Sequence, residues 1–250
     1  MTMKLQYSSR RISWIPLSIL AVITAGVILS ATNITQAQTV VYSFESPSIN
    51  PDGFGPNGGG VTISQDSIGA TAGAYSMKVS VVSGATFVGA LTGNVDPAIG
   101  NPPGVDHILF DLTIDQGSVY TGGFAVVGVT IFGANPGLGQ YGLQAQFADI
   151  EHIEGKAAGT YHDIQIDLDS ATNPLTFQPN QSFDQIFGSG TGPSDLIPTG
   201  FQFFFNKSND APLTAYIDNV RVFSSVPEPA TFGLLGLGTV MIAAMRKRGR

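Results

Sequence analysis

The sequence predicts an all-β domain, an antiparallel sandwich or barrel, with an apolar segment on either side of it. Between residues 38 and 225, apolar side chains recur at every second position, which is the periodicity of a half-buried strand. Turn sequences rich in Gly, Pro and Asn separate these stretches. The chain has 31 glycines among its 250 residues and only 12% charged residues, a composition that favours short strands and many turns over helical bundles.

Ten stretches of the domain have the pattern of a strand. The clearest is residues 75–82, where Met77, Val79 and Val81 share one face. About ten short strands at such spacing are typical of an antiparallel sandwich or barrel, and no internal repeat divides them. The predicted strands cover residues 39–45, 60–65, 75–82, 86–91, 107–114, 124–132, 142–147, 162–168, 200–205 and 213–223.

The connections between these strands contain turn residues and one short helical stretch. Pro and Asn close to a Gly occur at 50–53, 56–58, 101–104 and 135–137, which predicts reversals of the chain there. Residues 182–187 are the one helical candidate, with Ser182 in the N-cap position.

The N-terminal 37 residues have the order of an export signal. Lys4, Arg10 and Arg11 precede a mostly apolar stretch at 12–29, and small residues then end at Ala37. We therefore predict a signal peptide at 1–37 with cleavage after Ala37; the alternatives are cleavage after Ala31 and an uncleaved membrane helix. Cleavage would remove Trp14, the only tryptophan of the chain.

The C-terminal segment, residues 226–250, has three parts in a fixed order. Pro227, Glu228 and Pro229 hold the backbone extended, an uncharged apolar run follows at 230–245, and Arg246, Lys247, Arg248 and Arg250 end the chain. An apolar run followed by positive charge is the order of a segment that stops in a membrane with its basic end in the cytoplasm. As a helix the run would span roughly 24 Å, which is short against a hydrocarbon core of about 30 Å.

This arrangement resembles the PEP-CTERM sorting signal of Gram-negative bacteria. The resemblance implies transient anchoring in the inner membrane and cleavage near Pro227-Glu228-Pro229 by an exosortase-type membrane protease. It also implies a cell-surface or secreted destination, often beside exopolysaccharide production. The alternative is an ordinary tail anchor that stays in the membrane.

The charge distribution excludes some classes of function. All eighteen Asp and Glu lie between Glu45 and Glu228, where only four basic residues occur: Lys78, Lys156, Lys207 and Arg221. A surface that acidic repels nucleic acid and attracts divalent cations, so we expect no nucleic-acid partner. The chain has no cysteine, which excludes disulfides, thiol catalysis and cysteine metal sites.

Carboxylates at the two ends of the domain suggest a cation site. Asp218 has the same alternation parity as Tyr216, Val220 and Val222, and a carboxylate among inward apolar neighbours needs a cation or several hydrogen-bond donors. Hard oxygen ligands on an acidic chain suit Ca²⁺. The alternatives are that Asp218 pairs with Arg221 or Lys78, or accepts hydrogen bonds from backbone amides.

Three segments of the domain resemble jelly-roll carbohydrate-binding modules with the galactose-binding-like topology. They are Phe44-Glu45, the stretch 73–79 (GAYSMKV) and the closing stretch 216–222 (YIDNVRV). The resemblance implies a β-sandwich of jelly-roll type and a structural calcium bound by Glu45 and Asp218, with Ser76 as a weaker ligand. It also implies binding of an extracellular polysaccharide.

Aromatic side chains are the predicted contacts to such a glycan, because the C–H faces of sugar rings stack on flat rings. Trp serves best and is absent from the domain, which leaves Tyr120, Tyr141 and Tyr161, or a loop residue such as Phe54. Phe201, Phe203 and Phe205 share one face of their strand and are predicted to lie in the core, whereas Phe204 points the other way.

The sequence contains no catalytic motif, and we expect no enzyme. Its three histidines have no zinc-ligand spacing, and the acidic residues Asp149, Glu151, Glu154, Asp167 and Asp169 are those of a solvated strand face and a turn. We therefore expect an exported protein whose β-sandwich binds extracellular polysaccharide without catalysis. The alternative is a structural matrix or surface protein with no glycan ligand; a glycan-active hydrolase is a third possibility.

Overall fold

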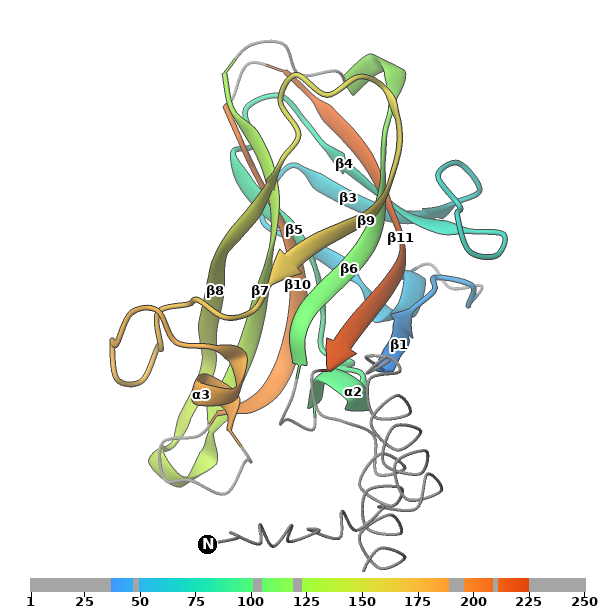
Figure 1. The fold of residues 1–250 in the computed structure, drawn as a ribbon. Coiled ribbons are helices and arrows are strands. Elements are labelled where there is room, and N and C mark those ends of the chain that lie inside the picture. The colour runs from blue at the N-terminus through green and yellow to red at the C-terminus, as the bar shows by residue number, and fades with distance from the viewer. Residues whose placement is uncertain are drawn as a thin grey trace, which may run out of the picture. The chain divides into compact units, whose positions relative to one another are not determined.

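The domain is a sandwich of two antiparallel sheets, as predicted (Figure 1). The computed structural model describes residues 37–46, 50–100, 105–118, 123–188, 196–208 and 211–224. The predicted signal helix and C-terminal hydrophobic helix lie outside these residues. No helix in the described ranges is long and apolar enough to cross a bilayer.

The first sheet has six strands in the order β3-β4-β11-β6-β9, with β1 paired to the second half of β11. Strand β11 therefore lies in the middle of the sheet. Along one edge it pairs first with β4 and then with β1, and along the other edge it pairs with β6. The strands are β1 (Ala37–Tyr42), β3 (Val61–Asp66), β4 (Ser76–Val81), β6 (Val105–Ile114), β9 (Gly159–Asp167) and β11 (Leu213–Ser224).

The second sheet has five strands in the order β2-β5-β10-β7-β8. Its central strand, β10, pairs with β5 on one side and with β7 on the other. The strands are β2 (Gly55–Asn57), β5 (Phe87–Thr92), β7 (Ala125–Asn135), β8 (Gln140–His152) and β10 (Ile197–Lys207).

Short helical turns connect the strands. Ser182 caps the helix α3 (Phe183–Phe187) as predicted: its side chain accepts a hydrogen bond from Gln185 N, while the Gln185 side chain accepts one from Ser182 N. The others are η1 (Pro51–Gly53), α2 (Pro97–Gly100), η2 (Gln116–Ser118) and η3 (Pro136–Leu138).

The core between the sheets is apolar and rich in aromatic rings. Met77, Val79 and Val81 of β4 are buried, and so are Phe201, Phe203 and Phe205 of β10, which confirms both predicted core faces. The ring of Phe203 packs edge-on against Phe110 of β6, with centroids 5.1 Å apart, so it joins the two sheets.

Two strand predictions differ from the structure. The first strand ends at Tyr42, before Glu45, because Phe44 takes a positive φ of 58° that breaks the extended backbone. The sequence predicts a turn at 56–58, but residues 55–57 form β2, an edge strand whose Pro56 pairs with Ala90 of β5. A proline is tolerated there because an edge strand leaves some of its amide positions unpaired.

Candidate functional site

The outer face of the second sheet is a continuous surface of neutral polar and aromatic side chains. The strand registers place Gln202 of β10 between Leu91 of β5 and Thr130 of β7, and Thr130 lies opposite Gln146 of β8. Two residues further along β10, Phe204 lies between Gly89 of β5 and Gly128 of β7. We call this surface the amide face; its polar and aromatic members are Phe87, Thr130, Phe132, Gln144, Gln146, Gln202, Phe204 and Asn206.

Two glycines allow the large side chains of β10 to lie flat on this face. A Cβ on Gly128 would come within 2.4 Å of Phe204 Cζ, and a Cβ on Gly89 within 2.1 Å of Gln202 Nε2. Phe204 is also stacked on Phe87, with ring centroids 5.3 Å apart and planes 24° apart. The ring of Phe204 is therefore buried, whereas Phe87 stays 50% exposed at the edge of the face.

Gln202 is the most informative residue of the amide face. It points away from the core, the residue as a whole is only 4% exposed, and its side-chain amide forms no hydrogen bond to the described residues. Its amide atoms are not among the fully buried atoms that lack a partner, so they stay accessible to solvent or to a ligand. An amide offers both a donor and an acceptor, which matches the hydroxyl groups of a sugar.

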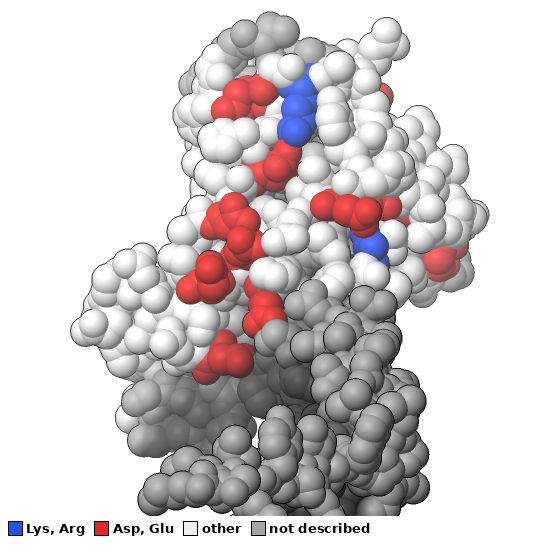
Figure 2. Space-filling model, viewed as in Figure 1, with Lys and Arg blue, Asp and Glu red and all other residues white. Residues whose placement is uncertain are grey.

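The outer face of the first sheet has the opposite character. Acidic side chains gather over β6, β9 and β11, with few basic side chains among them (Figure 2). The segment 67–75, between β3 and β4, covers part of this face: Gly69 lies so close to Tyr216 that an added Cβ would be 2.5 Å from its Cβ. This segment buries Asp218, which is fully inaccessible, and Asp111, which is 3% exposed.

Asp111 is the centre of a hydrogen-bonded network beneath this segment. Its carboxylate accepts hydrogen bonds from Thr71 Oγ1 at 2.6 Å, Asp163 N at 2.9 Å and Asn219 Nδ2 at 3.3 Å. Arg221 lies 3.6 Å from the same carboxylate and also pairs with Asp163. Asp163 and Asn219 have positive φ values of 56° and 52°, and both sit at irregularities in the strands on either side of Asp111.

The electrostatics of Asp111 follow from these contacts. Burial alone would raise the pKa of this carboxyl group. Hydrogen bonds from Thr71, the Asp163 amide, Asn219 and His162 stabilise its charged form and outweigh burial, so the pKa lies below its ordinary value of 3.8. Asp111 is therefore ionised at neutral pH and acts as a fixed acceptor.

The structure brings the predicted calcium ligands Glu45 and Asp218 to the same backbone segment. Asp218 Oδ2 accepts hydrogen bonds from Thr71 N at 2.6 Å and Ala72 N at 2.8 Å. Glu45 Oε1 accepts hydrogen bonds from Ala74 N and Tyr75 N, each at 2.9 Å. The two carboxylates thus hold the segment from both ends.

One oxygen of this arrangement is left without a partner. Asp218 Oδ1 is buried and makes no hydrogen bond in the described part of the chain. Lys78 pairs with Asp66, and Arg221 with Asp111 and Asp163, so neither forms the ion pair with Asp218 that the sequence left open. Ser76 is buried beside these residues, and its hydroxyl donates to Ile68 O at 2.5 Å.

The predicted glycan-binding tyrosines do not form one surface. Tyr141 is 69% exposed near the start of β8, in the second sheet. Tyr161 is on β9 in the first sheet, where Lys156 Nζ lies 4.7 Å from its ring centroid and its hydroxyl donates to Ala157 O. Phe54, the loop alternative, is fully buried in the core. Tyr120 lies outside the described residues, so its role stays a prediction.

The predicted processing sites lie at or beyond the ends of the described domain. Ala37, after which we predict signal cleavage, is the first residue of β1 and pairs with Ser224, the last residue of β11. Pro227, Glu228 and Pro229 lie outside the described residues. Cleavage at either site stays a prediction.

The acidic residues of β8 and β9 have structural partners. Asp149 accepts a hydrogen bond from Asp167 N at 2.8 Å, and Glu151 pairs with Lys156 at 2.7 Å. Glu154 pairs with His152 and accepts a hydrogen bond from Ala125 N. Burial raises the pKa of Glu154, but the hydrogen bonds from His152 and the Ala125 amide lower it, and the net effect is a lowered pKa. No group of three or more acidic, His or Cys side chains in the described ranges is arranged to hold a metal ion.

Sequence reasoning missed the two most distinctive residues, Gln202 and Asp111. Gln202 alternates with Phe201 and Phe203, so the pattern showed only that it points outward. Asp111 interrupts the apolar stretch from Ile108 to Leu112. A carboxylate within such a stretch was the signal in the sequence that could have indicated its burial.

Several solved structures that resemble this fold are described as carbohydrate-binding modules. The solution structure of CtCBM11 is 19% identical with a TM-score of 0.48, over 78% of this chain and 99% of that chain. The family 11 module of cellulase Lic26A-Cel5E from Clostridium thermocellum is 18% identical with a TM-score of 0.45, over 76% and 95%. A third structure, from a study of promiscuous specificity in β-sandwich carbohydrate-binding modules, is 14% identical with a TM-score of 0.46; 74% of this chain spans 62% of its length.

No curated protein sequence matches this chain. A family model does match one part of it: residues 225–248 fit the PEP-CTERM protein-sorting motif, which confirms the resemblance noted in the sequence. The chain is therefore a β-sandwich protein that carries a PEP-CTERM protein-sorting motif.

Proposed function

We propose that this protein is exported and binds a neutral extracellular polysaccharide along the amide face, without catalysis. The observation that carries the proposal is Gln202, an outward amide that is held flat over Gly89 at the centre of the face and forms no side-chain hydrogen bond within the described ranges. Around it, Thr130, Gln144 and Gln146 offer further neutral polar groups, and Phe87 offers an exposed ring for stacking.

The chemistry of the amide face supports binding over catalysis and a neutral ligand over a charged one. Its amide, hydroxyl and aromatic groups do not titrate near neutral pH, so they cannot exchange protons with a substrate as a general acid or base must. The acidic groups of β8 in this sheet, Asp149 and Glu151, are not among the members of the amide face, and both have structural partners: Asp149 accepts from Asp167 N, and Glu151 pairs with Lys156. The neutral members of the amide face can bind a neutral, hydroxyl-rich chain without any ionic contact. An acidic surface, in contrast, would repel an anionic polymer.

Processing and localisation form the second part of the proposal. The PEP-CTERM motif at 225–248 supports recognition by an exosortase-type membrane protease and cleavage near Pro227-Glu228-Pro229. Before cleavage, the apolar run 230–245 would hold the protein transiently in the inner membrane; afterwards the domain would remain at the cell surface or be secreted. The intact mass of the protein from the outer fraction tests this, because a mass equal to that of the full translation product would contradict it.

The glycan proposal predicts a specific loss of binding. We expect Gln202→Ala to weaken binding to a neutral exopolysaccharide of the host about tenfold, because the donor and the acceptor of one side-chain amide are lost at the centre of the face. Affinity electrophoresis or titration calorimetry with the purified chain measures this effect.

The matched control is Gln165→Ala, an exposed glutamine on β9 in the opposite sheet. It should bind as the wild type does. Equal weakening by both variants, or no binding of the wild type to any neutral polysaccharide in a broad panel, would contradict the proposal and favour a structural matrix protein.

We also propose a structural calcium ion held by Glu45 and Asp218. The residues fit such an ion: Asp218 Oδ1 is a buried carboxylate oxygen without a partner, and Glu45 holds the other end of the same segment, residues 71–75. Calcium takes six to eight oxygen ligands, so backbone carbonyls or water would complete the site, with Ser76 as the weaker candidate. A bound ion would offset the desolvation of Asp218 and fasten the segment to the sheet.

The calcium proposal predicts metal-dependent stability. We expect EDTA to lower the melting temperature of the wild type and added Ca²⁺ to restore it, because an ion that binds only the folded state stabilises that state. The variant Asp218→Asn should lose this response. The control is Asp169→Asn, which changes an exposed carboxylate and should keep the response to EDTA and Ca²⁺. A wild-type melting temperature that EDTA leaves unchanged would contradict the proposal.

A further inference from the structure

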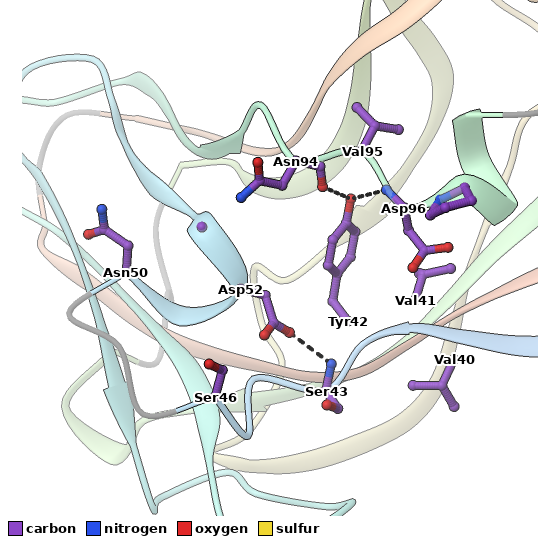
Figure 3. A pocket seen from close by; sticks show the side chains of 12 residues that line it. Val40, Val41, Tyr42, Ser43, Ser46, Asn50, Asp52, Asn94, Val95 and Asp96 are labelled. Atoms are coloured by element: carbon purple, nitrogen blue, oxygen red, sulfur yellow. Dashed lines mark hydrogen bonds between the residues drawn. The ribbon is translucent and has the colours of Figure 1, made fainter.

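A second possible ligand site is separate from the amide face and lies beside the residues that flank Glu45. It is an open pocket of about 690 Å³ between the end of β1, the turn η1 and the residues that precede α2 (Figure 3). Its volume falls within the range of small-molecule sites. The polar side chains that line it include Ser43, Ser46, Asp52, Asn94 and Asp96.

The walls of this pocket are fixed by hydrogen bonds. The Tyr42 hydroxyl donates to Asn94 O at 3.1 Å and accepts from Asp96 N at 3.3 Å, so it ties β1 to the far wall (Figure 3). Asp52 Oδ2 accepts from Ser43 N at 3.0 Å and Phe44 N at 2.7 Å, which joins η1 to the residues that follow β1. The pocket is therefore formed before a ligand arrives, which lowers the ordering cost of binding.

Asp52 holds its wall in a conformation that non-glycine residues rarely adopt. Its φ is +48°, and Gly53 follows with φ +80° at a point where an added Cβ would lie 2.5 Å from Asn94 Nδ2. Such backbone conformations cost free energy and persist only where the surroundings enforce them. Here the result is a carboxylate placed at the pocket wall, with Oδ2 accepting a hydrogen bond from Ser43 N, just after β1.

The pocket combines two carboxylates with apolar and neutral polar walls. Among the described residues that line it, Asp52 and Asp96 are acidic and none is Lys, Arg or His, so the formal charge of this lining is negative. The pKa of Tyr42, between them, is raised to about 12, first by burial and in part by the charges of Asp96 and Asp52, although its bond with the Asp96 amide lowers it. Val40, which is 54% exposed, and Val95 add apolar surface.

We propose that this pocket binds a small saccharide unit that carries a protonated amine. The negative charges of Asp52 and Asp96 would attract the ammonium group, and hydrogen bonds fix both carboxylates: Asp52 Oδ2 accepts from Ser43 N and Phe44 N, and Asp96 Oδ1 accepts from Ala98 N. The Ser43, Ser46 and Asn94 side chains suit the hydroxyl groups, and the valines suit the C–H face of a ring. The site is distinct from the amide face, which has no carboxylate, so the two sites would select different units of a glycan.

The test compares three sugars that differ only at one position: D-glucosamine, N-acetyl-D-glucosamine and D-glucose. We expect titration calorimetry of the full chain at mildly acidic pH to show glucosamine bound about tenfold more tightly than the other two, an advantage that falls as salt is added. Equal binding of all three sugars, or no binding of glucosamine, would overturn the proposal.

Variants then locate the site. Asp96→Asn should remove the preference for glucosamine while its melting temperature stays close to that of the wild type, because an Asn oxygen can still accept the hydrogen bond from Ala98 N. Asp169→Asn changes the net charge by the same amount outside the pocket and should keep the preference. Gln202→Ala should also keep it; loss of glucosamine binding in Gln202→Ala but not in Asp96→Asn would assign the amine to the amide face and overturn the proposal.

Discussion

The variant Asp111→Ala is expected to lower the free energy of unfolding by about 3–5 kcal/mol, because it removes a buried charged acceptor and leaves its donors unsatisfied. Thr71 Oγ1, Asp163 N and Asn219 Nδ2 each lose a hydrogen bond, and Arg221 keeps only the exposed Asp163 as an ionic partner. Urea unfolding followed by circular dichroism measures the change.

A matched control for this variant is Asp169→Ala, in which an exposed carboxylate is removed. Its effect should stay within about 0.5 kcal/mol of zero, as for most surface substitutions. An equal effect of both variants would show that Asp111 contributes through net charge and not through the network.

The pH dependence of stability gives an independent check on Asp111. Because the pKa of Asp111 in the folded state lies below 3.8, the carboxylate stabilises the fold above that value and its contribution is lost as the pH falls through the lower folded value. The stability of the wild type should therefore fall on acidification in this range, and more steeply than that of Asp111→Asn. Parallel profiles for the two proteins would contradict the assignment.

The variant Phe203→Ala should destabilise the protein by about 3–5 kcal/mol, because it leaves a cavity at the centre of the sandwich. Phe203 is fully buried and its ring contacts Phe110 of the opposite sheet, Phe201 of the same strand and Phe54 at 6.3 Å. Since rings from both sheets surround the site, the neighbours cannot collapse into the space without moving a strand. Urea unfolding measures this loss as well.

Phe177→Ala is the control for Phe203, because the Phe177 side chain is 79% exposed. It should change the free energy of unfolding by less than about 0.5 kcal/mol. A small effect of Phe203→Ala with an unchanged denaturant slope would mean that the core is more adaptable than the ring contacts indicate.

The strands of the domain could be predicted because their signal is local. Alternation in β4 and β10 placed Met77, Val79, Phe201 and Phe203 in the core, and each of them is buried. The N-cap of α3 was equally predictable, because Ser182 and Gln185 have the spacing of a capping box.

The binding surfaces could not be predicted to the same extent, because they depend on which strands are neighbours. The amide face is formed by β5, β7, β8 and β10, so Thr130 meets Gln202 only through the register of strands far apart in sequence. The burial of Asp111 depends on the segment 67–75 folding over it, which no local pattern records. β2 was missed because three residues around a proline carry too little alternation.

The pairing of β1 with β11 has a consequence for how the domain can be held. Ala37 lies opposite Ser224, and paired strands are about 5 Å apart, so both ends of the folded chain leave it at neighbouring points (Figure 1). A tether attached at either end would therefore hold the domain at the same place on its surface. A short peptide joining the two ends would close the backbone into a ring with little strain, and new ends could then be opened in a remote surface loop.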